Sequence, residues 1–215
     1  MLPSLYISHG SPMLALEPGE SGPALKRLAA QLAKPKAIVL LSAHWESADL
    51  RVASHPAPET WHDFGGFPRE LYAVQYPAPG DPALAARIVQ LLATHGLPAQ
   101  LDAKRPFDHG AWVPLSLMYP AADIPVVQVS LPSQLGPAGL NEVGQALASL
   151  RSEGILIKLA HKQGSVVMIG HPYPQTMAVL ERELPKLKAQ GIDQQIRRRL
   201  PGQALLRWLR IRRRG

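Results

Sequence analysis

The sequence predicts an α/β fold in which helices flank a wound, mostly parallel sheet. Short apolar runs bounded by turn residues alternate with longer segments of helical apolar spacing, which is typical of strand–helix–strand units. The 215 residues are 46% hydrophobic and 18% charged, which is the composition of a globular chain. This length is enough for one substantial domain, or for a domain with an appendage.

Each expected element carries a local signal. Strands are expected at the short apolar runs 5–8, 37–43, 126–131 and 155–157, with a further one at 50–54. Helices are expected where apolar residues recur at helical spacing, at 22–32, 82–94, 111–118 and 138–151. Asp81 is the expected N-cap of the helix that begins at Pro82. The segment 47–80 is instead rich in Pro, Gly, His and aromatic residues, and such long loops are often functional.

Basic residues are concentrated near the C-terminus. Residues 1–157 contain 10 Lys and Arg against 13 Asp and Glu, whereas residues 158–215 contain 13 against 3. The formal net charge of +7 therefore comes from the second part, where eight arginines and no acidic residue follow Gln194. We interpret this end as a solvated tail, because no aromatic-interleaved pattern or recognition helix accompanies it. Its contacts with nucleic acid or an anionic surface would be non-specific.

These patterns divide the chain into three expected parts. Residues 1–157 are expected to form the α/β domain. Residues 158–193 are expected to form an appendage, with a strand at 166–169 followed by a helix at 175–189. Residues 194–215 form the basic tail, for which weak order is expected.

Several classes of protein are excluded by the composition. No apolar run reaches the roughly 18 residues that a membrane span requires. The N-terminal residues lack the basic start and apolar stretch of a signal peptide, so a cytoplasmic protein is expected. The chain contains no cysteine, which excludes thiolate chemistry and leaves His, Asp and Glu as the residues that could hold a metal.

Two histidines occupy matching places at the ends of expected strands. His9 follows "LYIS" and His44 follows "VLLSA". In a parallel wound sheet, functional side chains gather at the carboxyl ends of the strands, where two imidazoles could share one divalent ion. Either histidine alone could equally be a hydrogen-bonded turn residue. As a pair, they favour a metal site.

Two further stretches carry candidate site residues. In "FDHGAW", Asp108 could cap a helix while His109 projects into the site as a general acid or base, although the pair could also simply begin the helix. In "WHDFGGFP", a Gly-rich bend presents His62, Phe64 and Phe67, which suit the lining of a pocket for a flat aromatic ligand.

Taken in order, these stretches resemble the DODA-type extradiol ring-opening dioxygenases of the class III, LigB-like group. The matching strings span residues 2–157: "SHGSP", "AIVLLSAHWES", "HDFGGFPRELYAVQYPAPGDP", "DHGAWVPLSLMYPAADIPVVQVSL" and "GILI". The resemblance implies one non-haem metal ion, Fe(II) for turnover or Zn(II), at one end of an α/β sheet. It also implies that the substrates are an aromatic diol and O2.

The resemblance assigns roles to individual residues. His9 and His44 match two metal ligands of the family. His109 matches the active-site histidine of the D-H-G-x-W motif, and His62 matches a position in the loop beside the substrate.

The chain departs from the family pattern after residue 157. Family members continue with a further active-site histidine and a third histidine ligand, and neither stretch is recognisable here. Residues 159–193 instead resemble the C-terminal part of the divergent polysaccharide deacetylases, so the chain looks like a truncated LigB-like domain with a foreign strand–helix appendage. His171, in "IGHP", is the best candidate for a replacement ligand, and Glu46 is a second one.

Three functional hypotheses follow. The first is an extradiol dioxygenase that acts on a catechol-type aromatic and whose activity is impaired by the loss of the third ligand. The second is a catalytically inactive relative. The third, a metal-dependent deacetylase-like hydrolase, leaves the first 157 residues unexplained.

Overall fold

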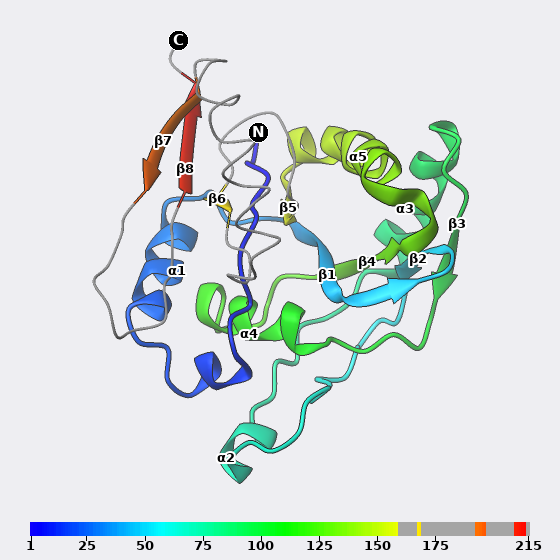
Figure 1. Cartoon of the computed structure of the whole chain (residues 1–215). Coiled ribbons are helices and arrows are strands. Elements are labelled where there is room, and N and C mark those ends of the chain that lie inside the picture. The colour runs from blue at the N-terminus through cyan, green and yellow to red at the C-terminus, as the bar shows by residue number, and fades with distance from the viewer. Residues whose placement is uncertain (159–166, 169–191, 197–208, 214–215) are drawn as a thin grey trace.

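The computed structural model describes residues 1–158, 167–168, 192–196 and 209–213 (Figure 1). A five-stranded sheet has the order β3-β2-β4-β1-β5. Its strands are β1 (Ala37–Ser47), β2 (Leu50–Ala53), β3 (Ala99–Asp102), β4 (Val126–Pro132) and β5 (Ile155–Lys158). Strand β1 lies between β4 and β5 and pairs in parallel with both. The expected α/β fold with a mostly parallel sheet is confirmed.

Within the described residues the chain forms five α-helices. They are α1 (Ser21–Ala30), α2 (Arg69–Tyr72), α3 (Pro82–Thr94), α4 (His109–Met118) and α5 (Gly136–Leu147). Short 3₁₀ helices lie at Pro12–Ala15, Ser133–Leu135 and Ala148–Glu153. Helix α3 has the expected bounds, and the Asp81 side chain caps it by accepting a hydrogen bond from the Leu84 N–H at 2.8 Å.

The sheet buries both of its faces, as strands with covering helices on two sides must. Alternate residues of β1 separate into the two cores: Ile38 and Leu40 join the cluster that includes α1 and α4, and Ala37 and Val39 join the cluster that includes α3 and α5. Figure 1 shows these two pairs of helices on opposite sides of the sheet. Helix α4 is buried along most of its length, so residues at its start are held firmly.

The N-terminal residues lie beside β5 without forming the strand expected at 5–8. A single parallel bridge joins Ser4 to Ile157, and the Leu5 N–H donates to the Ile157 carbonyl at 2.8 Å. Pro3 has no N–H to contribute to a ladder, and Gly10 turns the chain away with a φ of +66°. The segment nevertheless runs in the same direction as β5.

Strand β1 is longer than expected and is interrupted by a bulge. The pairing with β4 runs from Ile38 to Leu41 and resumes at Glu46, with a shift of register between these two residues. The expectation that His44 follows the strand is therefore wrong in detail, since His44 lies inside the bulge. Bulges re-aim side chains and are common next to active sites.

Two other features of the sheet differ from expectation. Strand β3 was not expected. It is a short edge strand whose residues are exposed or half-buried. Strand β2 pairs antiparallel with β4 and parallel with β3, which makes the sheet mixed. Because β2 follows β1 after a short turn, it has no crossover helix that would bring it back in parallel.

A second sheet has the order β6-β8-β7 and is antiparallel. Its strands are β6 (Val167–Met168), β7 (Ile192–Ile196) and β8 (Leu209–Arg213). Strand β6 falls within the strand expected at 166–169. Strands β7 and β8 overlap the tail for which weak order was expected, and the alternation of apolar and basic residues in "LRIRR" is the local signal for a strand there. His171 and the helix expected at 175–189 lie outside the described residues.

Among the helices of the described segments, none is both long enough and apolar enough to cross a membrane.

Candidate metal centre

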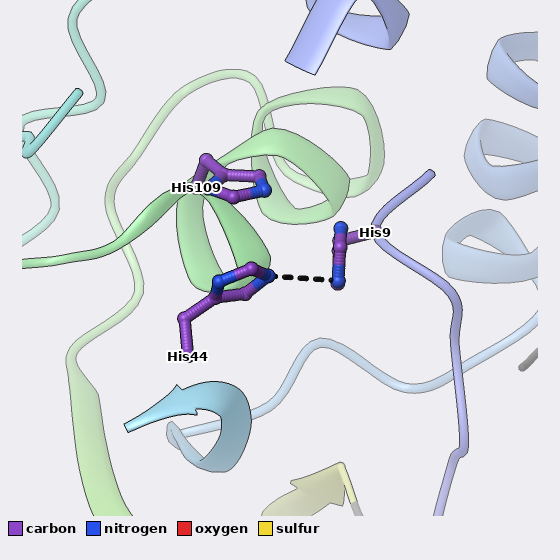
Figure 2. Close-up of side chains that lie close together, drawn as sticks. All are labelled: His9, His44 and His109. Atoms are coloured by element: carbon purple, nitrogen blue, oxygen red, sulfur yellow. Dashed lines mark hydrogen bonds between the residues drawn. The ribbon is translucent and has the colours of Figure 1, made fainter. Parts of the chain in front are cut away.

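Three histidines from distant parts of the chain meet at one end of the sheet (Figure 2). His9, His44 and His109 each offer a ring nitrogen, and these nitrogens all lie within 4.8 Å of one another. The ring centres are separated by 4.6 Å for His9 and His44, 4.9 Å for His9 and His109, and 4.1 Å for His44 and His109. The structure thus brings together the two histidines that were expected at strand ends and the histidine of the D-H-G-x-W motif.

A different local structure delivers each histidine. His9 ends the N-terminal segment that runs along β5, immediately before the turn at Gly10. His44 comes from the bulge of β1, and His109 is the first residue of α4. Asp108 caps this helix, as the sequence predicts, by accepting a hydrogen bond from the Ala111 N–H.

The ring of His9 is oriented by its own main chain. Its Nδ1 lies 2.8 Å from the Gly10 carbonyl oxygen. A carbonyl oxygen only accepts hydrogen bonds, so Nδ1 carries the proton and the Nε2 of a neutral ring presents a lone pair. That Nε2 lies 3.0 Å from the Nε2 of His44, as the dashed line in Figure 2 shows.

A single carboxylate, that of Asp63, contacts both other histidines. Its Oδ1 accepts hydrogen bonds from the main-chain N–H and the ring Nδ1 of His109, each at 2.9 Å. Its Oδ2 lies 3.6 Å from the Nδ1 of His44. Asp63 thereby favours a proton on the Nδ1 of both rings, which leaves Nε2 as the atom that can bind a cation or accept a proton.

The electrostatics of Asp63 fit this role. Burial by itself would raise the pKa of the carboxyl, but hydrogen bonds from the ring and main chain of His109, together with the charge of His109, lower it below its usual value. Asp63 is 9% exposed, and the side chain of His109 is 7% exposed. The carboxylate is therefore an ionised acceptor in a nearly dry place, where its hydrogen bonds are strong.

The group fits a divalent metal ion. Two nitrogen ligands about 2.1 Å from one ion, at right angles to each other, are about 3.0 Å apart. If both imidazoles carry their proton on Nδ1, their Nε2 lone pairs face each other at 3.0 Å and repel. A cation or a shared proton between the two atoms removes this repulsion. Imidazole nitrogens oriented by main-chain and carboxylate acceptors are the usual arrangement around protein-bound iron and zinc.

Aromatic rings from the long loop stand next to His109. The Phe64 ring centre lies 5.6 Å from that of His109 and 5.2 Å from that of Phe67. The ring of His62 is 5.7 Å from that of Phe64, and its Nε2 is 3.0 Å from the Val74 carbonyl oxygen. The three residues expected to bind substrate therefore form one aromatic cluster with Phe64 nearest the histidines, while a main-chain contact holds His62.

Of the other two candidate ligands, only Glu46 lies within the described residues, and it is not part of the histidine group. Glu46 is exposed and resumes the pairing of β1 with β4 beyond the bulge. His171 lies outside the described residues. The role of Asp63 was not predicted, because its contact with His109 joins residues 46 positions apart. Its only signal in the sequence is a place in a loop already expected to reach the site.

Comparison with known proteins finds two matching families. Residues 3–160 match the family described as the catalytic LigB subunit of aromatic ring-opening dioxygenase. Residues 150–195 match the divergent polysaccharide deacetylase family.

Individual relatives carry related names. The chain is 43% identical over 197 residues to the 4,5-DOPA dioxygenase extradiol of Escherichia coli K12, a match that covers 88% of this chain and 72% of the relative. It is 48% identical over 160 residues to the 4,5-DOPA dioxygenase extradiol of Beta vulgaris, covering 72% of this chain and 59% of the relative.

A solved structure is also similar. The crystal structure of an uncharacterized protein, JW3007, from Escherichia coli K12 matches with a TM-score of 0.59 and 35% identity, covering 79% of this chain and 66% of that one. The chain thus spans about three-fifths to three-quarters of the length of these proteins. The family match covers most of the chain, so the protein belongs to the LigB family of aromatic ring-opening dioxygenases.

Proposed function

We propose that the protein is a metal-dependent extradiol dioxygenase that opens the ring of a catechol-type aromatic with O2. The observation that carries the proposal is the group of three histidines in which two Nε2 atoms lie 3.0 Å apart. The names of the relatives support the reaction class. A small aromatic diol is the proposed organic substrate.

His9 and His44 are the proposed ligands of one ion, Fe(II) or Zn(II). Their Nε2 atoms lie 3.0 Å apart. The Gly10 carbonyl oxygen contacts the opposite edge of the His9 ring, and Asp63 faces that of the His44 ring. A bound divalent ion would supply Lewis-acid activation of the diol and, as ferrous iron, redox chemistry toward dioxygen.

His109 is the proposed general acid and base. Asp63 accepts a hydrogen bond from the Nδ1–H of His109, so the Nε2 of His109 can take a proton from a diol hydroxyl and later return it. The ionised Asp63 also stabilises the imidazolium that forms in between, as the carboxylate of a catalytic triad does. His62, Phe64 and Phe67 are the proposed wall against which the flat substrate lies.

The division of the chain is part of the proposal. Residues 1–157 would carry the catalytic α/β domain, 158–193 a strand–helix appendage and 194–215 a basic tail, in a cytoplasmic protein. His171 would approach the ion as a further ligand. His171→Ala tests that last point: unchanged metal content would exclude it.

Iron content and oxygen uptake test the function together. The chain is loaded anaerobically with Fe(II), and uptake of O2 is followed with DOPA, protocatechuate and gallate while the visible absorbance of a ring-cleavage product is recorded. We expect one iron per chain and a coloured product from at least one diol. Iron-free protein that consumes no O2 would indicate an inactive relative, and release of acetate from an N-acetylated sugar would indicate a hydrolase.

A pair of variants separates the two proposed roles of the histidines. His9→Ala is expected to lose both iron and activity. His109→Ala is expected to retain iron but to lose turnover by about 10²–10⁴-fold, the usual contribution of a general acid or base. If His109→Ala instead loses the ion, His109 is a ligand and the proposed proton transfer is wrong.

A further inference from the structure

The main chain of His44 is held at both its N–H and its C=O by groups that meet at one carboxylate. The His44 N–H donates to the Ser42 Oγ at 3.1 Å, and that hydroxyl donates to the Asp108 Oδ1 at 2.5 Å. The Nη2 of Arg105 donates both to the His44 carbonyl oxygen at 3.2 Å and to the Asp108 Oδ2 at 2.6 Å. These four bonds close a ring around the main chain of His44. We call the three residues that supply their side chains, Ser42, Asp108 and Arg105, the Asp108 clamp.

The clamp is buried and charged. Asp108 is fully buried, and the side chain of Arg105 is 11% exposed. The guanidinium group lies 4.9 Å from the ring centre of Trp45 and 5.2 Å from that of Trp61, which shields it from water. An ion pair in such a place is rigid, because breaking it would leave an unpaired charge in the interior.

The same carboxylate is tied to His109 by covalent structure. Asp108 is the N-cap of α4 and His109 is the first residue of that helix, so neither can move without the other. Gly110 lets the helix approach the bulge closely: a Cβ there would lie 2.6 Å from the Ser42 Oγ and 2.9 Å from the His44 Cδ2. The clamp therefore joins the β1 bulge to the start of α4 at the point where the histidines face each other.

We infer that Ser42, Asp108 and Arg105 are positioning residues that set the separation of His44 from His109 independently of any ion. The regular ladder does not set this separation, because its register with β4 shifts between Leu41 and Glu46. A histidine in an irregular strand segment needs another anchor if its ring is to stay within ligand distance of its partners. The inference rests on the proposed metal site and adds three residues that act on it through the main chain.

Ser42→Ala tests the clamp, and Ser130→Ala is the matched control. Ser130 is also fully buried, and its Oγ likewise accepts a main-chain N–H, that of Arg51, at 2.8 Å while facing the Asp49 carbonyl at 3.4 Å. Each variant removes one buried bridging hydroxyl, but only Ser42 belongs to the clamp. Co(II) is titrated into the full chain, and both its affinity and its visible absorption bands are recorded beside thermal unfolding.

We expect Ser42→Ala to bind Co(II) about tenfold more weakly and with shifted absorption bands. Substitution of residues that orient metal ligands commonly weakens metal binding to this extent. Ser130→Ala should bind as the unchanged protein does, with a similar loss of thermal stability. Equal affinities and identical bands in the two variants would overturn the inference.

A second pair of variants covers the case in which Ser42→Ala does not fold. Arg105→Met keeps an apolar stem between the two tryptophans, and Arg105→Lys restores a cation and its donors. Co(II) affinity should fall in the order unchanged protein, Arg105→Lys, Arg105→Met. A methionine variant that binds as tightly as the lysine variant would contradict the clamp.

The metal proposal and the clamp can fail separately. If the unchanged protein binds no Co(II), the proposed metal site is wrong, and the clamp is then judged in the metal-free protein from the ¹⁵N chemical shifts of the His44 ring. A shift in Ser42→Ala but not in Ser130→Ala supports the clamp, and equal shifts overturn it.

Discussion

Replacement of Gly110 by alanine probes how tightly α4 packs against the β1 bulge. An added Cβ would lie 2.6 Å from the Ser42 Oγ, 2.9 Å from the His44 Cδ2 and 3.0 Å from the Asp108 Oδ1. Ordinary contact begins near 3.4 Å, so the nearest of these distances is short by about 0.8 Å. The contacted groups are a proposed ligand and two members of the clamp, and none of them is the end of a flexible side chain in open space.

Two opposing effects determine the sign of the change in stability. Gly110 is helical, and alanine is favoured over glycine within a helix by up to about 1 kcal/mol. Against this stand an overpacking cost of about 1–3 kcal/mol and the weakening of the charged hydrogen bond between Ser42 and Asp108, worth about 1.5–3 kcal/mol. We expect Gly110→Ala to lower the free energy of unfolding by about 2–4 kcal/mol and to weaken Co(II) binding as well.

Urea unfolding followed by circular dichroism measures the first quantity, and Co(II) titration measures the second. Gly65→Ala serves as the control, because a Cβ at Gly65 would meet no atom within 4 Å although the residue lies in the loop that carries Asp63. It should change the free energy of unfolding by no more than about 0.5 kcal/mol. If Gly110→Ala is more stable than the unchanged protein and binds Co(II) equally well, the close approach of α4 to the bulge is wrong.

Three further substitutions address the site, the core and the pH dependence. Asp63→Asn should lower kcat about 10–100-fold in steady-state O2 uptake, and an unchanged kcat would exclude Asp63 as the partner of His109. Leu40→Ala, at a fully buried position, should cost about 2–5 kcal/mol in urea unfolding while Co(II) affinity stays the same, which separates core packing from the site. Burial raises the pKa of Tyr119 to about 12, so the unfolded chain, whose tyrosines ionise near pH 10, releases the proton first. The free energy of unfolding should therefore hold below about pH 10 and fall toward pH 12, and Tyr119→Phe should flatten that fall; an identical slope in the variant would contradict the assignment.

The sequence by itself determined most of the regular structure, because the signals involved are local. Helix α3 begins at the Asp81–Pro82 cap and has the expected bounds, and the consecutive apolar residues at the start of β1 are buried on the two faces of the sheet. The proximity of His9 and His44 could also be predicted, since segments that run in the same direction within one sheet end at the same edge. Their role as ligands remains a prediction.

Only the tertiary structure decided how the site is held. The bulge that carries His44, the carboxylate of Asp63 beside His109 and the clamp at Asp108 each depend on contacts between residues 46 or more positions apart. No periodicity or cap signals such contacts, because they arise only when the faces of separate elements have packed. Local chemistry fixes which residues can form a strand or cap a helix, whereas the distances among site groups are fixed by the non-local packing of α4 against β1.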